Sequence, residues 1–263
     1  MADSEEYQVI YGNASDMMLI QGAEVDLVLT SPPYFSDETE PLLKRPLREQ
    51  NEVDRVEQEI VAFALSLRPI FQEIRRILKP GCALVLQTKD IRYGGFLLGL
   101  ADVHRSMAES VGFRLVTRVH WQEAFQHPAR HQVVPKSPDV REFRAYDTEM
   151  FLVFGGEDGI VRGETPVELS SEEMEACVTP LWKLAGPGGS KTHPYQSPAS
   201  VVRRLIALYS APGELVVDPF AGHGTTIRAA TEMGRRALGY EIDRGNVDKA
   251  VDLLARKAGR SRG

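Results

Sequence analysis

A glycine-rich turn between an apolar run and a helical segment constrains the fold of this chain more than any other feature. The apolar run Leu215–Asp218 leads through Pro-Phe-Ala-Gly-His-Gly-Thr to Thr226. Gly222 and Gly224 let the backbone approach a ligand where a side chain would clash. Ligands bind α/β sheets at the carboxyl ends of strands, and Asp218 stands at such an end. The turn therefore predicts a strand–turn–helix unit with a ligand at its tip.

An acidic residue follows this turn at the spacing typical of nucleoside binding. The next strand ends at Glu241, 23 residues after Asp218, where an acid is placed to bind ribose hydroxyls. The dinucleotide pattern fails because residue 227 is Ile, and no Lys follows to bind phosphates. Two glycines in such a turn can also be present only because they allow tight packing, with no ligand involved. The whole string together with Glu241 favours a nucleoside-containing cofactor.

The rest of the chain alternates compact apolar runs with segments of helical spacing. The expected strands are Tyr7–Tyr11, Val25–Thr30, Ala83–Gln87, Phe113–Trp121, Glu149–Phe154, Leu215–Asp218 and Arg236–Glu241. The expected helices are Glu59–Leu78, Phe96–Ser110, Pro198–Tyr209, Thr225–Met233 and Arg244–Lys257. This alternation predicts an α/β fold with a mostly parallel sheet covered on both faces. Residues 35–58 are expected to form a mobile loop, and residues 155–197 to be mostly irregular.

A second motif, Ser31-Pro32-Pro33-Tyr34, comes directly after the buried strand Val25–Thr30. It offers a hydroxyl, a backbone carbonyl that two rigid prolines hold facing outward, and a flat ring. This set suits an exocyclic amino group of a nucleobase, with Tyr34 stacking on the face of the base. Pro-Pro also marks ordinary surface turns, so the motif alone is only suggestive.

Composition excludes several other classes of protein. At 263 residues with 43% hydrophobic and 26% charged residues, the chain is typical of a soluble globular protein that buries a proper core. We expect no membrane span and no signal peptide, and a cytoplasmic setting. Cys82 and Cys177 are too few for a disulfide framework, and the histidines lack metal-ligand spacing, so no metal site is expected.

The net charge of −6 counts mildly against a nucleic-acid partner, but charge is unevenly distributed. Residues 156–178 hold seven acids against one Arg, whereas residues 113–147 hold six Arg or Lys against four acids. The basic stretch is the better candidate for DNA contact. Its candidate phosphate contacts are Arg130, Lys136, Arg141 and Arg144, which could equally form a solvated hairpin.

Together the two motifs resemble those of S-adenosylmethionine-dependent amino-methyltransferases of DNA. The catalytic motif precedes the cofactor motif, as in the circularly permuted β group of that family. The segments Gly12–Asp16 and Ile77–Leu86, and His193-Pro194 before the helix that precedes Asp218, are also similar. The resemblance implies a Rossmann-like, seven-stranded, mostly parallel sheet with one antiparallel strand, which we assign to Glu149–Phe154.

The resemblance also implies the cofactor S-adenosyl-L-methionine and roles for individual residues. The catalytic residues would be Ser31, Pro32, Pro33 and Tyr34. The cofactor-binding residues would be Asp16, Thr30, His193, Ser197, Asp218, Pro219, Phe220, Ala221, Gly222, Gly224, Thr225, Thr226 and Glu241. A Ser at the first catalytic position is most often associated in this family with N4-cytosine methylation, and an Asp with N6-adenine. Cytosine is thus favoured, and the alternatives are adenine, RNA or an inactive nucleic-acid-binding module.

The expected organisation is one methyltransferase domain over residues 1–263. Insertions at about 35–58, 122–147 and 155–197 would serve target recognition. They are modest for this family, in which many members carry a recognition region of about 80 residues or more. The expected partner is duplex DNA with a flipped base, and a homodimer or a separate specificity partner would account for further recognition.

Overall fold

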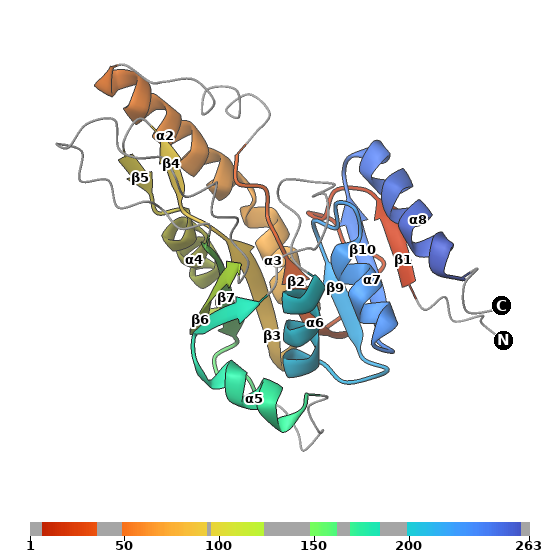
Figure 1. Cartoon of the computed structure of the whole chain (residues 1–263). Coiled ribbons are helices and arrows are strands. Elements are labelled where there is room, and N and C mark those ends of the chain that lie inside the picture. The colour runs from red at the N-terminus through yellow and green to blue at the C-terminus, as the bar shows by residue number, and fades with distance from the viewer. Residues whose placement is uncertain are drawn as a thin grey trace.

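A computed structural model describes residues 7–35, 49–93, 96–123, 148–161, 169–184 and 199–258. Its centre is an eight-stranded sheet of order β1-β10-β9-β2-β3-β7-β6-β8 (Figure 1). The strands are β1 (Tyr7–Tyr11), β2 (Val25–Thr30), β3 (Leu78–Thr88), β6 (Arg114–Glu123), β7 (Thr148–Gly155), β8 (Leu181–Leu184), β9 (Leu215–Asp218) and β10 (Arg236–Glu241). A separate hairpin joins β4 (Ile91–Tyr93) to β5 (Phe96–Leu98).

Strand β7 is the one strand of the sheet that runs against its neighbours. It pairs antiparallel with both β3 and β6, whereas the pairs on either side of them are parallel. This confirms the assignment of the antiparallel strand to Glu149–Phe154. The sheet has eight strands where seven were expected, because β8 adds to its edge beside β6.

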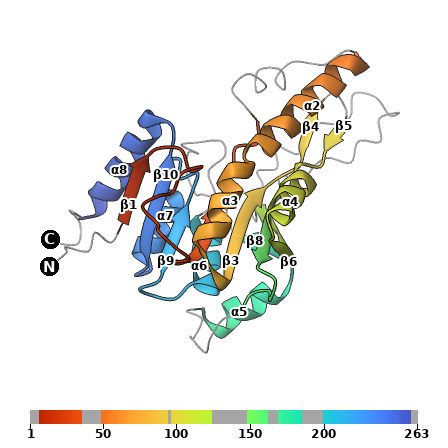
Figure 2. The same cartoon turned by 180° about the vertical axis from the view of Figure 1, so that it is seen from behind.

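Helices cover both faces of the sheet (Figures 1 and 2). They are α2 (Gln50–Ser66), α3 (Arg68–Ile77), α4 (Leu100–Ser110), α5 (Ser171–Val178), α6 (Ala199–Tyr209), α7 (Thr225–Glu232) and α8 (Arg244–Ala258). Helices α3 and α4 bury their apolar sides against one face, and α6 and α7 against the other. Alternate residues of β3 separate into these two cores: Leu84 and Leu86 on the α3 side, Ala83 and Val85 on the α6 side. In the described residues, no helix is long and apolar enough to cross a membrane.

The prediction of a mobile loop over residues 35–58 is wrong in its last part, because α2 begins at Gln50. Val53, Val56 and Ile60 follow a helical spacing and are buried, but acidic side chains between them obscure the pattern. The single helix expected over Glu59–Leu78 is in fact two. Pro69 lacks an N–H donor and stands in the first turn of α3, so the chain turns at Leu67.

Two further expectations need correction. Phe96–Leu98 is a strand of the small hairpin rather than the first turn of a helix, and α4 starts at Leu100. The segment 155–197, expected to be mostly irregular, contains α5 and β8. The sequence carried a signal for α5, since Ser170 and Glu173 form a reciprocal capping box at its start.

Candidate functional site

Three neighbouring parallel strands end together at one edge of the sheet, and each delivers a polar residue there. The order is β9, β2 and β3, with Val28 level with Val217 and Thr30 level with Leu86. Asp218 ends β9, Ser31 follows β2, and Gln87 lies near the end of β3. The catalytic turn predicted from the sequence thus lies between the glycine-rich turn and β3.

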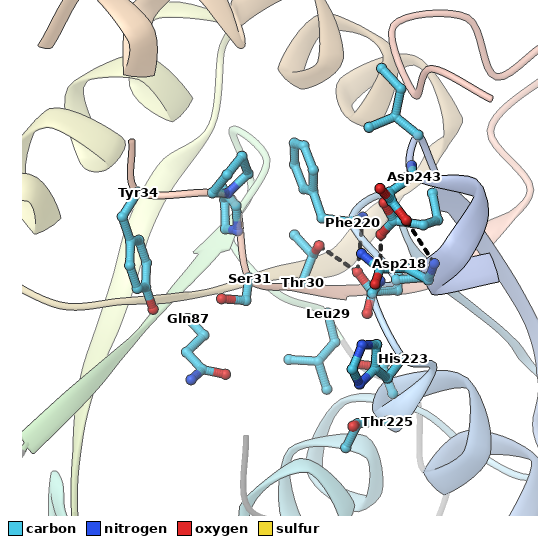
Figure 3. A pocket seen from close by; sticks show the side chains of 18 of the residues that line it. Leu29, Thr30, Ser31, Tyr34, Gln87, Asp218, Phe220, His223, Thr225 and Asp243 are labelled. Atoms are coloured by element: carbon cyan, nitrogen blue, oxygen red, sulfur yellow. Dashed lines mark hydrogen bonds between the residues drawn. The ribbon is translucent and has the colours of Figure 1, made fainter. Parts of the chain in front are cut away.

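A pocket of about 580 Å³ opens at this edge (Figure 3). Its lining includes most of both predicted motifs, although they lie almost 190 residues apart in the chain. The lining residues are Leu29, Thr30, Ser31, Pro32, Pro33, Tyr34, Phe35, Gln87, Val202, Asp218, Phe220, Ala221, Gly222, His223, Thr225, Thr226, Glu241, Ile242, Asp243 and Asn246.

The glycine-rich turn takes the conformation that its sequence predicts. Gly222 and Gly224 have φ angles of 51° and 79°, in the left-handed region that other residues rarely adopt, and Gly224 begins α7. The Glu241 carboxylate ties the turn to β10: it accepts from the Gly222 N–H at 2.8 Å and from the Asp243 N–H at 2.9 Å. A carboxylate offers about four acceptor positions, so the same group can still bind hydroxyls.

Asp218 is a buried carboxylate at the base of the pocket, only 4% exposed. It accepts a hydrogen bond from the Thr30 hydroxyl at 2.5 Å and another from the Phe220 N–H at 3.1 Å. Burial raises the pKa of Asp218 to about 6, with a smaller upward push from the charge of Glu241, while the hydrogen bonds from Thr30 and Thr226 oppose the shift. A buried carboxylate held in this way favours a cationic ligand, because such a charge would stabilise its ionised form.

The catalytic turn is anchored by its aromatic residue. Tyr34 is 7% exposed and packs in a small apolar cluster with α2, α4 and the β4–β5 hairpin. The Lys89 ammonium lies 5.5 Å from the centre of its ring. Ser31 and Phe35 remain partly exposed beside it. The cluster fixes where the turn sits, and the Tyr34 ring forms a wall of the pocket.

Some predicted site residues do not line the pocket. Asp16 lies exposed in the loop after β1, with its backbone N–H bonded to the Asn13 carbonyl. Pro219 and Gly224 belong to the glycine-rich turn but do not line the pocket. The remaining predicted residues lie outside the described residues: His193, Ser197, Arg130, Lys136, Arg141 and Arg144.

The structure adds residues that the sequence predictions missed. Val202 reaches the pocket from α6, Ile242 and Asp243 come from the turn between β10 and α8, and Asn246 comes from the first turn of α8. Gln87 is the most unexpected addition, because it is 2% exposed and polar. Its signal in the sequence was a lone amide at the end of an otherwise apolar strand. In the described residues, no group of three or more His, Cys, Asp or Glu side chains could hold a metal ion.

The fold and the pocket define a Rossmann-like α/β protein whose strand ends bind a nucleoside-type ligand beside a polar, proline-rich turn. Comparison with known proteins gives the family: residues 25–252 match the model of the N6/N4 DNA methylase family, and the chain belongs to that family. Both predicted motifs fall within the matched residues.

Individual relatives agree with this membership. The type II methyltransferase M.MjaI of Methanocaldococcus jannaschii is 29% identical over 90% of this chain and 88% of its own. The structure of a putative DNA modification methylase from Thermus thermophilus, complexed with S-adenosyl-L-methionine, matches with a TM-score of 0.71 and 25% identity over 95% of this chain and 93% of its own. The PvuII cytosine-N4-specific DNA methyltransferase shares the fold, with a TM-score of 0.66 and 21% identity over 93% of this chain and 85% of its own.

Proposed function

We propose that this chain transfers a methyl group from S-adenosyl-L-methionine to the exocyclic N4 amine of a cytosine that is flipped out of duplex DNA. The observation that carries the proposal is the meeting of two distant motifs at one pocket, Ser31 on one side and Asp218 on the other. Membership of the N6/N4 DNA methylase family makes an amino group of DNA the acceptor. The choice of cytosine within that family is our inference.

The pocket fits the cofactor on three counts. Asp218 is a buried carboxylate that suits a positively charged ligand, since S-adenosyl-L-methionine carries a sulfonium. Glu241 lies where an acid binds ribose hydroxyls. Gly222 lets the ligand approach the backbone without meeting a side chain. When bound, the cofactor supplies an electrophilic methyl group.

Ser31 and Pro32 prepare the acceptor nitrogen. The lone pair of an exocyclic amine is normally conjugated with the ring and is a poor nucleophile. We infer that the Ser31 hydroxyl and the Pro32 carbonyl accept one amino proton each, which favours a tetrahedral nitrogen whose lone pair faces the methyl group. In-line positioning supplies much of the remaining acceleration. The surplus proton leaves after transfer, when the nitrogen is cationic, so no strong base is needed beforehand.

Tyr34 forms the wall against which the base would lie. A base inside a duplex cannot reach such a pocket and must rotate out of the stack. The ring of Tyr34 is held from behind by α2 and the β4–β5 hairpin. A pre-positioned ring costs little entropy when the base arrives. We infer that its pocket-facing side receives the base, and that Phe35 extends the wall.

Ser31 is also the observation that favours cytosine over adenine, through the family association of this residue with N4 methylation. The target sequence would be read by the regions at about 35–58, 122–147 and 155–197, within one methyltransferase domain over residues 1–263. The same proposal includes a homodimer or a specificity subunit. It also includes phosphate contacts by Arg130, Lys136, Arg141 and Arg144.

The test is incubation with methyl-labelled cofactor on unmethylated DNA and on RNA, followed by digestion to nucleosides. The expected result is label in DNA as N4-methylcytosine. Label only in N6-methyladenine would contradict the choice of base, and label only in RNA would contradict the choice of polymer. Cofactor binding without label in either polymer would reject the enzyme and favour the alternative of an inactive nucleic-acid-binding module.

A further inference from the structure

The hydroxyl of Thr30 joins the two strands between which the pocket opens. Strand β2 is followed by β3 on one side and β9 by β10 on the other, so the chain order reverses between β2 and β9. Ligands of open α/β sheets bind at such a reversal. In the described residues, the last backbone pair between these strands is Val28 with Val217. Beyond it, the Thr30 hydroxyl donates to Asp218 at 2.5 Å and continues the link at the base of the pocket (Figure 3).

This bond holds both the orientation and the charge of Asp218. The Thr30 hydroxyl and the Phe220 N–H donate to the same carboxylate oxygen, Oδ1, from two different elements, which limits rotation of the group. A hydroxyl at 2.5 Å has the length of a charge-assisted bond to an ionised acceptor. Donation of this kind favours the ionised form of a carboxylate. Thr30 is 2% exposed, so water does not readily take the place of its hydroxyl.

The surroundings of Asp218 work against its charge. Burial raises the pKa of Asp218 to about 6, and the charge of Glu241 on β10 adds a smaller rise. Hydrogen bonds from Thr30, from Thr226 on α7 and from the Phe220 N–H oppose the rise, and that from Thr30 is the strongest of them. The remaining titratable side chains that line the pocket are Tyr34, His223 and Asp243. Thr30 thus counts most among the donors that keep this buried acid ionised.

We propose that Thr30 is a positioning residue that acts through Asp218: it holds the carboxylate ionised and directed at the cofactor. This proposal rests on the proposed function, in which Asp218 receives the sulfonium of S-adenosyl-L-methionine. A hydroxyl carries one proton, and Asp218 accepts it, so Thr30 does not donate to the cofactor itself. Ser31 follows Thr30 directly. One strand end therefore presents the catalytic turn and also supports the acid that binds the methyl donor.

The rival explanation is that Thr30 only ties β2 to β9. Both roles predict weaker cofactor binding when the hydroxyl is removed, so affinity at a single pH does not decide between them. They differ in how the loss depends on pH. A structural tie is lost equally at every pH. A hydroxyl that keeps Asp218 ionised matters only where the carboxylate would otherwise bind a proton.

The deciding experiment uses Thr30→Val, which removes the hydroxyl and keeps the branched side chain. The dissociation constant of S-adenosyl-L-methionine is measured by calorimetry from pH 5.5 to 8.5. If the hydroxyl favours the ionised form about tenfold, its removal moves the midpoint of about 6 upward by about one pH unit. We expect the variant's dissociation constant to match the wild type at pH 8 and to be about fivefold weaker at pH 6. Titration of the cofactor itself cancels in this ratio.

Three further variants test whether the effect passes through Asp218. Thr30→Ser keeps a hydroxyl and should follow the wild type at every pH. Combined with Asp218→Asn, Thr30→Val should lose its pH dependence, because no carboxylate remains. Thr88→Val is the matched control: it removes a buried hydroxyl at the end of the neighbouring strand β3, and this hydroxyl pairs with His104 Nδ1. Its ratio to the wild type should stay near one throughout.

A ratio for Thr30→Val that is equal at pH 6 and pH 8 would overturn the role of Thr30 and leave the proposed function intact. A pH-dependent loss that persists beside Asp218→Asn, or that appears equally in Thr30→Ser, would overturn it as well. Thr30→Ala, with the same expected profile, replaces Thr30→Val if valine disturbs the fold. A wild-type protein that binds the cofactor yet labels no DNA would instead reject the proposed function.

Discussion

The two halves of the pocket are built in different ways. The cofactor half, around β9 and β10, is a local structure: Gly222, Gly224 and the carboxylates of Asp218 and Glu241 all come from 24 consecutive residues. The backbone N–H groups of Phe220 and Gly222 donate to these two carboxylates. The target half, around β3 and β7, joins side chains from separate places. Gln87 and Glu149 lie 62 residues apart and meet only through strand pairing.

This difference separates a part of the site that depends on neighbouring residues from a part that depends on the pairing of distant strands. In the cofactor half, main-chain N–H groups of the turn donate to two carboxylates from the same short stretch of sequence, so this arrangement depends on local residues. A pocket wall built from side chains on neighbouring strands can change residue by residue without disturbing the turn. Variants in the two halves should therefore affect different measurements.

The largest expected effect on cofactor binding comes from a change in the cofactor half. Asp218→Asn keeps an acceptor for Thr30 and Phe220 but removes the charge, so we expect cofactor affinity to fall about 100-fold, as for the loss of a buried charged partner. Isothermal titration measures it. Asp26→Asn is the matched control: Asp26 is 5% exposed at the opposite end of the sheet, bonded to Lys79 and the Leu215 N–H. An equal loss of cofactor affinity in Asp26→Asn would contradict the assignment of cofactor binding to the cofactor half.

The same carboxylate makes cofactor binding depend on pH. The pKa of Asp218 is raised to about 6, so the group is ionised above that pH and increasingly protonated below it. A cationic cofactor prefers the ionised form. We therefore expect affinity to be constant above about pH 7 and to fall by up to about tenfold per unit below pH 6. Titrations between pH 5 and 8 on wild type and Asp218→Asn test this, and a flat wild-type profile would contradict it.

A smaller effect is expected where the turn packs on β10. A Cβ at Gly239 would lie 2.8 Å from the Ala221 Cβ and 3.1 Å from Ile227 Cγ1, so Gly239→Ala must push the turn outward. We expect a loss of about 2 kcal/mol in unfolding free energy, typical of overpacking, and weaker cofactor binding. Gly213→Ala offers a contrast, because it strains the backbone at φ 82° without such a collision and lies away from the pocket. Intact cofactor binding in Gly239→Ala would show that the turn is not held by this contact.

The smallest effect at neutral pH concerns the support of the target half. His104 on α4 is fully buried with its Nδ1 2.9 Å from the Thr88 hydroxyl, and burial lowers its pKa to about 4. A histidine with a depressed pKa in the folded state contributes stability above its unfolded pKa of 6.5, which is lost as pH falls toward 4. Between pH 7 and 5 this costs about 2 kcal/mol. Urea unfolding measures this difference: between pH 7 and 5, the unfolding free energy of His104→Gln should fall by about 2 kcal/mol less than that of the wild type.

The sequence predicted the local half of the site better than the long-range half. Asp218, the glycine turn and Ser31-Pro32-Pro33-Tyr34 could be found because each motif is contiguous and follows an apolar strand. Gln87 and Glu149 could not, since their partnership depends on the pairing register of β3 and β7. The same limit explains which elements of the fold could be predicted. The sequence predicts β2, β9 and β10 with the bounds that the structure shows. It did not predict α2, whose apolar spacing is obscured by acidic residues, or β8, which forms only by pairing with β6.

Ser31→Ala tests most directly the claim that one pocket joins a cofactor half to a target half. Cofactor affinity and single-turnover methyl transfer to DNA are measured on the same preparation. We expect affinity within about twofold of the wild type and transfer slowed by about 100-fold or more, because the acceptor that prepares the amine is gone. Transfer at the wild-type rate, or a loss of affinity as large as the loss of rate, would contradict the account.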